Sequence, residues 1–269
     1  MLSFITWDVD PTLFSIAGRD IRWYGLMWGL GFLVGYEMIS RLFKYEKHPD
    51  SWADKLFIYA IISSVIGARL GHCFFYAWDY YSIHPIEIFK IWEGGLASHG
   101  GVFALIITLV FYSRKVTRQS VWWLFDRMIP AIAVVCACIR FGNLMNSEIF
   151  GFPTDMPWGF KFVRSSEWIR DYNGFPCHPT QIYEMIYCLV ALAVSLLMYW
   201  KLHLQSRVGL ITGVSLLIFF GSRFGLEFLK NPQVAAETNM TFNLGQWLSV
   251  PLILLGIYLI VRACVRKPQ

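Results

Sequence analysis

The sequence predicts an all-α polytopic membrane protein with about seven transmembrane helices, forming a single integral membrane domain over residues 1–269. Hydrophobic residues make up 56% of the chain and charged residues 15%, and the mean hydropathy is +0.49. This composition is typical of proteins that live in lipid. Apolar stretches of about 20 residues, the length that crosses a bilayer, occur at 21–42, 53–77, 96–113, 121–140, 181–200, 208–229 and 245–263.

The distribution of charge predicts the orientation of these helices. Basic residues collect after the first, third and fifth stretches and in the tail: Arg41, Lys44, Lys47, Arg114, Lys115, Arg118, Lys201, Arg207, Arg262, Arg266 and Lys267. The alternate segments are acidic or mixed: Asp8, Asp10, Asp20, Asp79, Glu87, Glu93 and residues 231–241. Cytoplasmic loops collect Lys and Arg, so we expect the N-terminus outside and the C-terminus in the cytoplasm of a bacterial inner membrane.

The longest connection, residues 141–179 between the fourth and fifth helices, then lies outside the cell membrane. It is too rich in glycine and proline for one helix, with Gly151, Pro153, Pro157, Gly159, Gly174, Pro176 and Pro179. We expect a small extracytoplasmic head or loop insertion here. Residues 1–20 lack the basic start and apolar core of a cleavable signal peptide.

Several other classes of function are disfavoured. The formal net charge is +5, but the basic residues are concentrated in particular loops. This distribution indicates a topology signal rather than a nucleic-acid partner. The six cysteines have no spacing typical of a metal site or a disulfide framework. We therefore expect neither a metal nor an organic cofactor.

The orientation assigns a depth to each polar residue within the apolar stretches. Arg69 lies about 24 Å along an outward-running helix, at about 1.5 Å per residue. Polar groups at the outer ends of the other helices are Arg22, Tyr24, His99, Arg140, Tyr183, Glu184, Arg223 and Glu227. The comparable inner cluster is Asp126 with Arg127, which we interpret as a paired anchor.

Each of these residues also has a structural explanation when taken alone. Arg22 and Arg69 can extend along a helix end toward water, and His99 can be a packing histidine. Arg223 and Glu227 are four residues apart and can form an intrahelical pair. Asn143 and Asn146 can end a helix in a turn, and Gly94, Gly95, Gly100 and Gly101 can mark close helix packing. Convergence at one depth favours function, because charges within a bilayer are costly.

A basic site in the outer leaflet suits an anionic lipid headgroup. Arginine binds phosphate in a planar, bidentate manner, and histidine can accept a proton near neutral pH. The residues thus indicate either phosphate-ester chemistry on a lipid or transport of a lipid.

Six motifs in order resemble bacterial prolipoprotein diacylglyceryl transferases over nearly the whole chain. They are residues 21–25 (Ile-Arg-Trp-Tyr-Gly), 67–71 (Gly-Ala-Arg-Leu-Gly), 94–101 (Gly-Gly-Leu-Ala-Ser-His-Gly-Gly), 140–151 (Arg-Phe-Gly-Asn-Leu-Met-Asn-Ser-Glu-Ile-Phe-Gly), 178–184 (His-Pro-Thr-Gln-Ile-Tyr-Glu) and 223–227 (Arg-Phe-Gly-Leu-Glu).

The resemblance implies a transferase of lipoprotein biosynthesis. Such an enzyme moves the diacylglyceryl group of phosphatidylglycerol to the lipobox cysteine of a prolipoprotein signal peptide, forming a thioether and releasing glycerol 1-phosphate. It implies catalytic roles for His99, Tyr24, Arg140 and Arg223. It implies phosphatidylglycerol binding by Arg140, Asn143, Asn146, Glu148, Gly151, Arg223, Glu227 and Arg69. We expect a monomer whose active site faces the extracytoplasmic leaflet.

Three residues depart from the family pattern: Ser147 and Ile139 where glycine is usual, and Lys230 where a further arginine is frequent. A serine costs little unless the backbone needs a positive φ, and lysine supplies charge without a bidentate fork. Two alternatives remain, a lipid or anion transporter and a binding or scaffolding protein for lipoprotein precursors. A transporter would carry polar groups into the cytoplasmic half or show inverted repeats.

Overall fold

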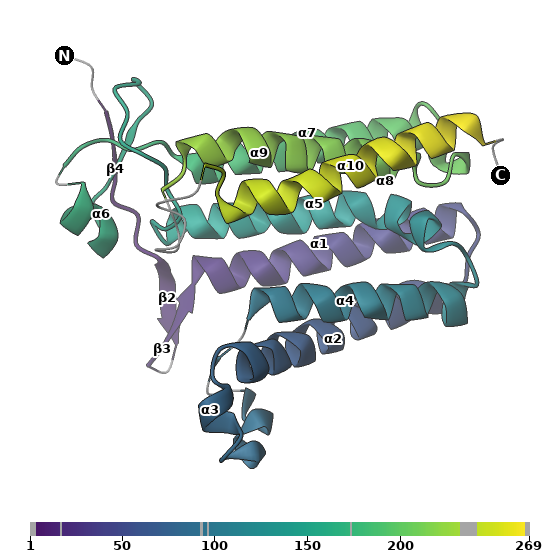
Figure 1. Cartoon of the computed structure of the whole chain (residues 1–269), viewed down its shortest axis with the longest axis horizontal. Helices are drawn as coiled ribbons and strands as arrows, with labels where there is room; N and C mark the ends of the chain where they lie inside the picture. Colours follow the sequence, from purple (N-terminus) through teal and green to yellow (C-terminus); the bar gives the residue numbers. More distant parts are fainter. Residues whose placement is uncertain are drawn as a thin grey trace. The chain divides into compact units, whose positions relative to one another are not determined.

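The structure is a computed structural model that describes residues 4–16, 18–91, 94–95, 97–172, 174–231 and 241–266. Helices dominate it, with a few short strands (Figure 1). The elements in order are β1 Ile5–Trp7, β2 Thr12–Ile16, β3 Arg19–Arg22, α1 Trp23–Tyr45, α2 Ser51–Phe75, α3 Trp78–Tyr81, η1 Pro85–Phe89, α4 Ser98–Tyr112, η3 Ser113–Thr117, α5 Val121–Met145, β4 Phe160–Phe162, α6 Ser166–Asp171, α7 Thr180–Trp200, η4 Leu204–Ser206, α8 Leu210–Leu216, η5 Leu217–Gly221, α9 Ser222–Leu226, η6 Glu227–Leu229 and α10 Leu244–Val265.

The predicted class, a polytopic helical membrane protein, is confirmed. Within the described residues, six helices are long and apolar enough to span a bilayer: Ser51–Phe75, His99–Thr117, Val121–Met145, Thr180–Trp200, Leu210–Leu229 and Leu244–Val265. Helix α1 is 23 residues long but carries Glu37, Arg41 and Lys44, and its place as the first of seven spans stays a prediction. So does the orientation. Glu93, residues 232–240, Lys267 and the start of the predicted third span at residue 96 lie outside the described residues.

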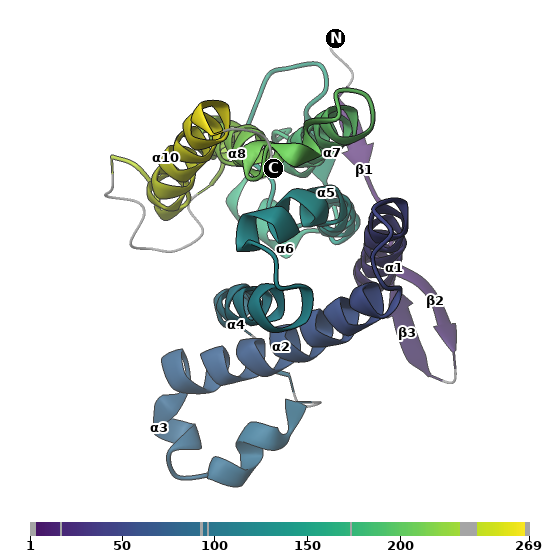
Figure 2. The same cartoon turned by 90° about the vertical axis from the view of Figure 1, so that its right-hand side faces the viewer.

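The chain forms two compact units. The first contains Met1–Met38 and Phe125–Gln269, and the second contains Ile39–Leu124. In the first unit, α8 and α10 run side by side, and both views show this pair (Figures 1 and 2). Gly31 of α1 allows close packing on α5, because an added Cβ would come within 3.3 Å of the Cys138 side chain.

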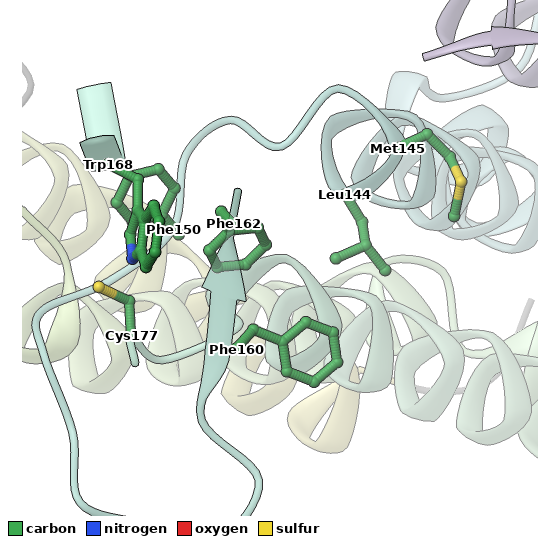
Figure 3. Packing of buried hydrophobic residues seen from close by; sticks show 7 residues of the cluster. All are labelled: Leu144, Met145, Phe150, Phe160, Phe162, Trp168 and Cys177. Atoms are coloured by element: carbon green, nitrogen blue, oxygen red, sulfur yellow. The ribbon is translucent and has the colours of Figure 1, made fainter. Parts of the chain in front are cut away.

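The head lies at one end of the first unit and includes more of the chain than residues 141–179. Strand β1 pairs with β4 in parallel, with Ile5 opposite Phe160. A buried cluster around β4 joins the end of α5 to the head (Figure 3). It consists of Leu144, Met145, Phe150, Phe160, Phe162, Trp168 and Cys177. Burial raises the pKa of the Cys177 thiol to about 12, so this thiol stays neutral at physiological pH.

Asp126 joins the start of α5 to the start of α8 by a cap supplied from another helix. Its carboxylate accepts hydrogen bonds from the backbone N–H of Gly209 at 2.6 Å and of Thr212 at 2.8 Å, and from the Thr212 hydroxyl at 2.6 Å. The first N–H groups of a helix lack partners within the helix. The residue that we interpreted as an anchor paired with Arg127 therefore also fixes where α8 begins.

The second unit is built on close contact between α2 and α4. An added Cβ on Gly67 would come within 2.5 Å of the Gly100 carbonyl oxygen, and one on Gly71 within 2.8 Å of the Gly100 Cα. Small residues let helix backbones approach in membranes. The packing explanation for Gly100 is thus confirmed. Gly94 and Gly95 instead have positive φ angles of 88° and 68°, a backbone conformation that favours glycine.

Replacing Gly67 by alanine is expected to destabilise the second unit, because the added methyl group meets the Gly100 backbone and the Cβ of Ala104, and neither can rotate away. Overpacking of this kind costs about 1–3 kcal/mol, which lowers the melting temperature by several degrees. The melting temperature is measured by thermal unfolding in detergent. Gly29→Ala is the matched control, because nothing lies within 4 Å of its added Cβ. Equal melting temperatures for the two variants would contradict the packing explanation.

Asp126→Ala should destabilise the protein more than Asp126→Asn. Alanine leaves two buried backbone donors unsatisfied, at about 1–3 kcal/mol each, whereas asparagine keeps one acceptor oxygen. The loss of stability of each variant is measured as the decrease in its melting temperature. The control is Asp50→Ala, since Asp50 stands at the N-cap of α2 without a side-chain capping bond. If Asp50→Ala lowered the melting temperature as much as Asp126→Ala, this would be evidence against the capping role of Asp126.

Candidate active site

The polar cluster at the end of α5 is held together by carboxamides. Arg140 Nη1 donates to Asn143 Oδ1 at 3.2 Å. Asn143 Nδ2 donates to Glu148 Oε1 at 2.8 Å, and Asn146 Nδ2 donates to the same oxygen at 3.1 Å. Four residues that the sequence predicted as a site therefore form one hydrogen-bonded group.

A buried carboxylate at the start of α7 approaches the other edge of Arg140. Glu184 is fully buried, and its Oε2 lies 2.8 Å from Arg140 Nε. The N–H is not aligned on this oxygen, so the contact is an ion pair rather than a linear hydrogen bond. Lys230 Nζ donates to the other oxygen, Glu184 Oε1, at 2.7 Å. Glu184 therefore joins α5 to the residue that follows η6.

A second carboxylate continues this chain of charges to Arg223. Glu227 Oε1 lies 3.5 Å from Lys230 Nζ and 3.3 Å from Arg223 Nη2. Asn243, the N-cap of α10, donates from Nδ2 to Glu227 Oε2 at 3.0 Å. Gly245 makes room for this carboxylate, because an added Cβ would lie 2.5 Å from Oε1. The intrahelical pair of Arg223 with Glu227 is thus one link of a larger network.

The five charged residues Arg140, Glu184, Lys230, Glu227 and Arg223 form a continuous ion-pair chain. Its two ends are partly open: the Arg140 side chain is 21% exposed and that of Arg223 is 33% exposed. Its centre is closed, since the Lys230 side chain is 3% exposed. Two partly exposed guanidiniums, each paired with a buried carboxylate, can bind an anion such as a phosphate.

The turn after α5 has an unusual backbone. Ser147 and Ile149 have φ angles of 55° and 60°, in the left-handed region where a side chain costs about 1–2 kcal/mol. Ser147 therefore occupies a position that favours glycine, which is the condition under which this departure from the family pattern matters. The first residues of α7 hold the turn: Thr180 Oγ1 donates to the Ile149 carbonyl at 2.8 Å, and Gln181 Nε2 donates to that of Glu148 at 2.6 Å.

Gly151 has a steric role in this turn. An added Cβ would meet the Leu229 carbonyl oxygen, and it would lie 2.8 Å from Thr180 Cγ2. The Gly151 N–H donates to the His178 carbonyl at 2.9 Å. These contacts explain the glycine by backbone packing, without a contact to lipid.

Tyr24, at the start of α1, packs beside the signature residues of α5. An added Cβ on Gly142 would lie 2.8 Å from Tyr24 Cδ2, and the rings of Trp23 and Phe141 meet edge to face at 6.4 Å. The structure therefore brings Tyr24 to the same end of α5 as Arg140 and Asn143.

Arg69 belongs to the second unit, and its guanidinium donates hydrogen bonds to backbone carbonyls. Its guanidinium donates to the carbonyls of Glu87 at 2.5 Å, Ile88 at 2.9 Å and Gly94 at 2.6 Å, and its residue surface is 2% exposed. These contacts tie the segment of α3 and η1 to α2. They favour the structural explanation of Arg69 that the sequence left open.

His99 lies in the first turn of α4, also in the second unit, with an exposed side chain. Its role as a base stays a prediction. A second imidazole lies in the first unit, where His178 Nδ1 is 3.2 Å from the Tyr183 hydroxyl. Burial lowers the pKa of His178, so this ring is neutral at physiological pH.

Sequence reasoning gave no role to several residues of the network. Glu184 was noticed by its depth and as the last residue of the 178–184 motif, and Lys230 only as a departure from the pattern. Asn243 had a signal that was not used, since an asparagine three residues before Gln246 can form a capping box. That capping box is present. No cluster of three or more His, Cys, Asp or Glu side chains suited to a metal occurs within the described part of the chain.

Comparison with known proteins agrees with the motifs. The family model described as prolipoprotein diacylglyceryl transferase matches residues 11–262. The chain is 45% identical to the phosphatidylglycerol--prolipoprotein diacylglyceryl transferase of Porphyromonas gingivalis, covering 99% of this chain and 96% of the relative. It is 43% identical to the protein of that name from Chloroherpeton thalassium, covering 99% and 97%. The chain therefore belongs to the prolipoprotein diacylglyceryl transferase family.

Proposed function

We propose that this protein transfers the sn-1,2-diacylglyceryl group of phosphatidylglycerol to the lipobox cysteine thiol of prolipoproteins. The products are a thioether-linked prolipoprotein and glycerol 1-phosphate. Two relatives that each cover nearly the whole chain carry the name of this activity. The observation that carries the proposal is the pair of partly exposed guanidiniums, Arg140 and Arg223, held by one ion-pair chain.

The reaction is a substitution at carbon. The substrate thiol loses its proton to a base, because the thiolate is the nucleophile. The thiolate then attacks the glycerol carbon that bears the phosphate ester, the S–C bond forms, and the C–O bond breaks with its electron pair on the departing phosphate. Arg140 and Arg223 stabilise the charge that grows on this phosphate. Glu148, Glu227 and the two asparagines, Asn143 and Asn146, hold the guanidiniums in position.

We assign the base role to His99 and a catalytic role to Tyr24. This assignment rests on the family resemblance and on the exposed imidazole at the start of α4. The enzyme's own cysteines are not required, since the acceptor thiol belongs to the substrate peptide.

The membrane setting follows from the charge pattern of the loops. The site faces the extracytoplasmic leaflet of the bacterial inner membrane, and residues 141–179 of the head receive the signal peptide or control lipid entry. The protein acts as a monomer on lipid and peptide substrates in the bilayer.

Proteoliposomes that contain phosphatidylglycerol and a lipobox peptide test the function. We expect release of glycerol 1-phosphate together with a diacylglyceryl mass gain on the peptide. Neither should occur with a peptide whose cysteine is changed to serine. Movement of labelled lipid between leaflets, without reaction, would instead support the transporter alternative.

Arg140→Ala should lower kcat/KM for this reaction by about 10²–10³-fold, the usual effect of removing one group that stabilises transition-state charge. Arg140→Lys should recover little of this, because an ammonium cannot engage Glu184 and Asn143 from two edges at once. Arg170→Ala is the control, since Arg170 is an exposed arginine paired with its neighbour Asp171. Normal release of glycerol 1-phosphate by Arg140→Ala would show that the phosphate lies elsewhere.

His99→Gln should lower kcat by about 10²-fold or more, as expected for a general base, while the affinity for phosphatidylglycerol changes little. Single-turnover kinetics at matched protein levels measure the rate. His84→Gln is the control, because His84 is an exposed histidine of the same unit. If His99→Gln keeps most of the rate, the base is another group.

A further inference from the structure

The centre of the ion-pair chain is a lysine that no predicted role uses. Lys230 Nζ lies 2.7 Å from Glu184 Oε1 and 3.5 Å from Glu227 Oε1, and its side chain is 3% exposed. A buried ammonium that contacts two carboxylates is a counter-ion for both. The Lys230 ammonium is therefore buried between the two carboxylates, whereas the side chains of Arg140 and Arg223 are partly exposed.

We propose that Lys230 and Glu184 are positioning residues that keep Arg140 and Arg223 available to the lipid phosphate. The inference rests on the proposed function and adds to it the residues that set the strength of its phosphate site. Lys230 does not contact the phosphate; it acts on the two arginines through their carboxylate partners.

The physical reason is competition for the guanidiniums. A buried carboxylate attracts a neighbouring guanidinium strongly, because water screens the attraction poorly there. The attraction is strongest when the guanidinium is the only counter-ion of that carboxylate. Glu184 has one cation on each oxygen, Arg140 on Oε2 and Lys230 on Oε1. Glu227 contacts Arg223, Lys230 and the Asn243 amide. Lys230 supplies part of the charge that both carboxylates need. The arginines consequently keep more of their attraction for an incoming anion.

The same geometry gives Glu184 a directional role. It contacts Arg140 at Nε, and Asn143 accepts from Nη1. Within the part of the chain that the structure describes, the partners of Arg140 contact Nε and Nη1, so Nη2 remains for a ligand. Fixing a guanidinium at two nitrogens orients the third, which is the preorganisation that an anion site requires.

Lys230→Met tests the proposal, because methionine removes the charge and retains an unbranched side chain. We expect the affinity for phosphatidylglycerol to fall by about tenfold to a hundredfold, the range of one charge-assisted contact. Native mass spectrometry in detergent measures this binding without peptide, with phosphatidylcholine as the lipid control. Lys230→Arg should stay close to the wild type. Lys201→Met, at the exposed end of α7, is the matched control.

The double variant Glu184→Gln with Lys230→Met separates positioning from simple structural support. Glutamine keeps the size of the side chain beside Arg140 Nε and removes the uncompensated carboxylate, so we expect about a threefold or larger recovery of affinity over Lys230→Met. Melting temperatures of all variants are measured alongside. Wild-type affinity in Lys230→Met, or a loss confined to melting temperature, would overturn the proposal, as would a double variant no better than Lys230→Met.

Turnover of the wild type with the lipobox peptide is measured in parallel. Lipid binding without turnover would refute the proposed function, while the lysine variants still report on the phosphate site. Failure of the wild type to bind phosphatidylglycerol would overturn both.

Discussion

The ion pair of Glu184 with Arg140 is the constraint on which the head end of the first unit depends. A fully buried carboxylate needs cations around it, and Glu184 takes one from α5 and one, Lys230, from the segment after η6. The residues just before it on α7, Thr180 and Gln181, hold the left-handed turn that carries Glu148. The contacts that fold this end of the protein are therefore the contacts that arrange its arginines.

The sequence predicted the residues of the site better than their partners. Depth along the predicted helices identified Arg140, Arg223 and Glu227, because intramembrane charge is costly wherever it occurs. The free-energy cost of burying a charge does not specify which groups will pair with it. Arg69 satisfies its guanidinium with three backbone carbonyls of its own unit. Arg140 instead uses two side chains, Asn143 of its own helix and Glu184 of α7. Nothing in the spacing of residues distinguishes these two outcomes.

The helices were likewise more predictable than the head. Long apolar stretches report spans directly, and their ends agree with the structure to within a few residues at α5, α7 and α10. The head depends on pairing between β1 and β4, which are more than 150 residues apart in the chain. Such pairing leaves little local signal in three-residue strands. For the same reason the sequence did not reveal that Ser147 needs a positive φ, since that requirement comes from the turn held by α7.

The central claim is that Arg140 and Arg223 bind one phosphate as a unit. A double-mutant cycle tests it most directly: the affinity for phosphatidylglycerol is measured for Arg140→Ala, Arg223→Ala and the double variant. Groups that share one ligand are not additive, so the account predicts that the double variant binds little more weakly than either single variant. Losses that multiply independently would contradict it and would place the two arginines at separate sites.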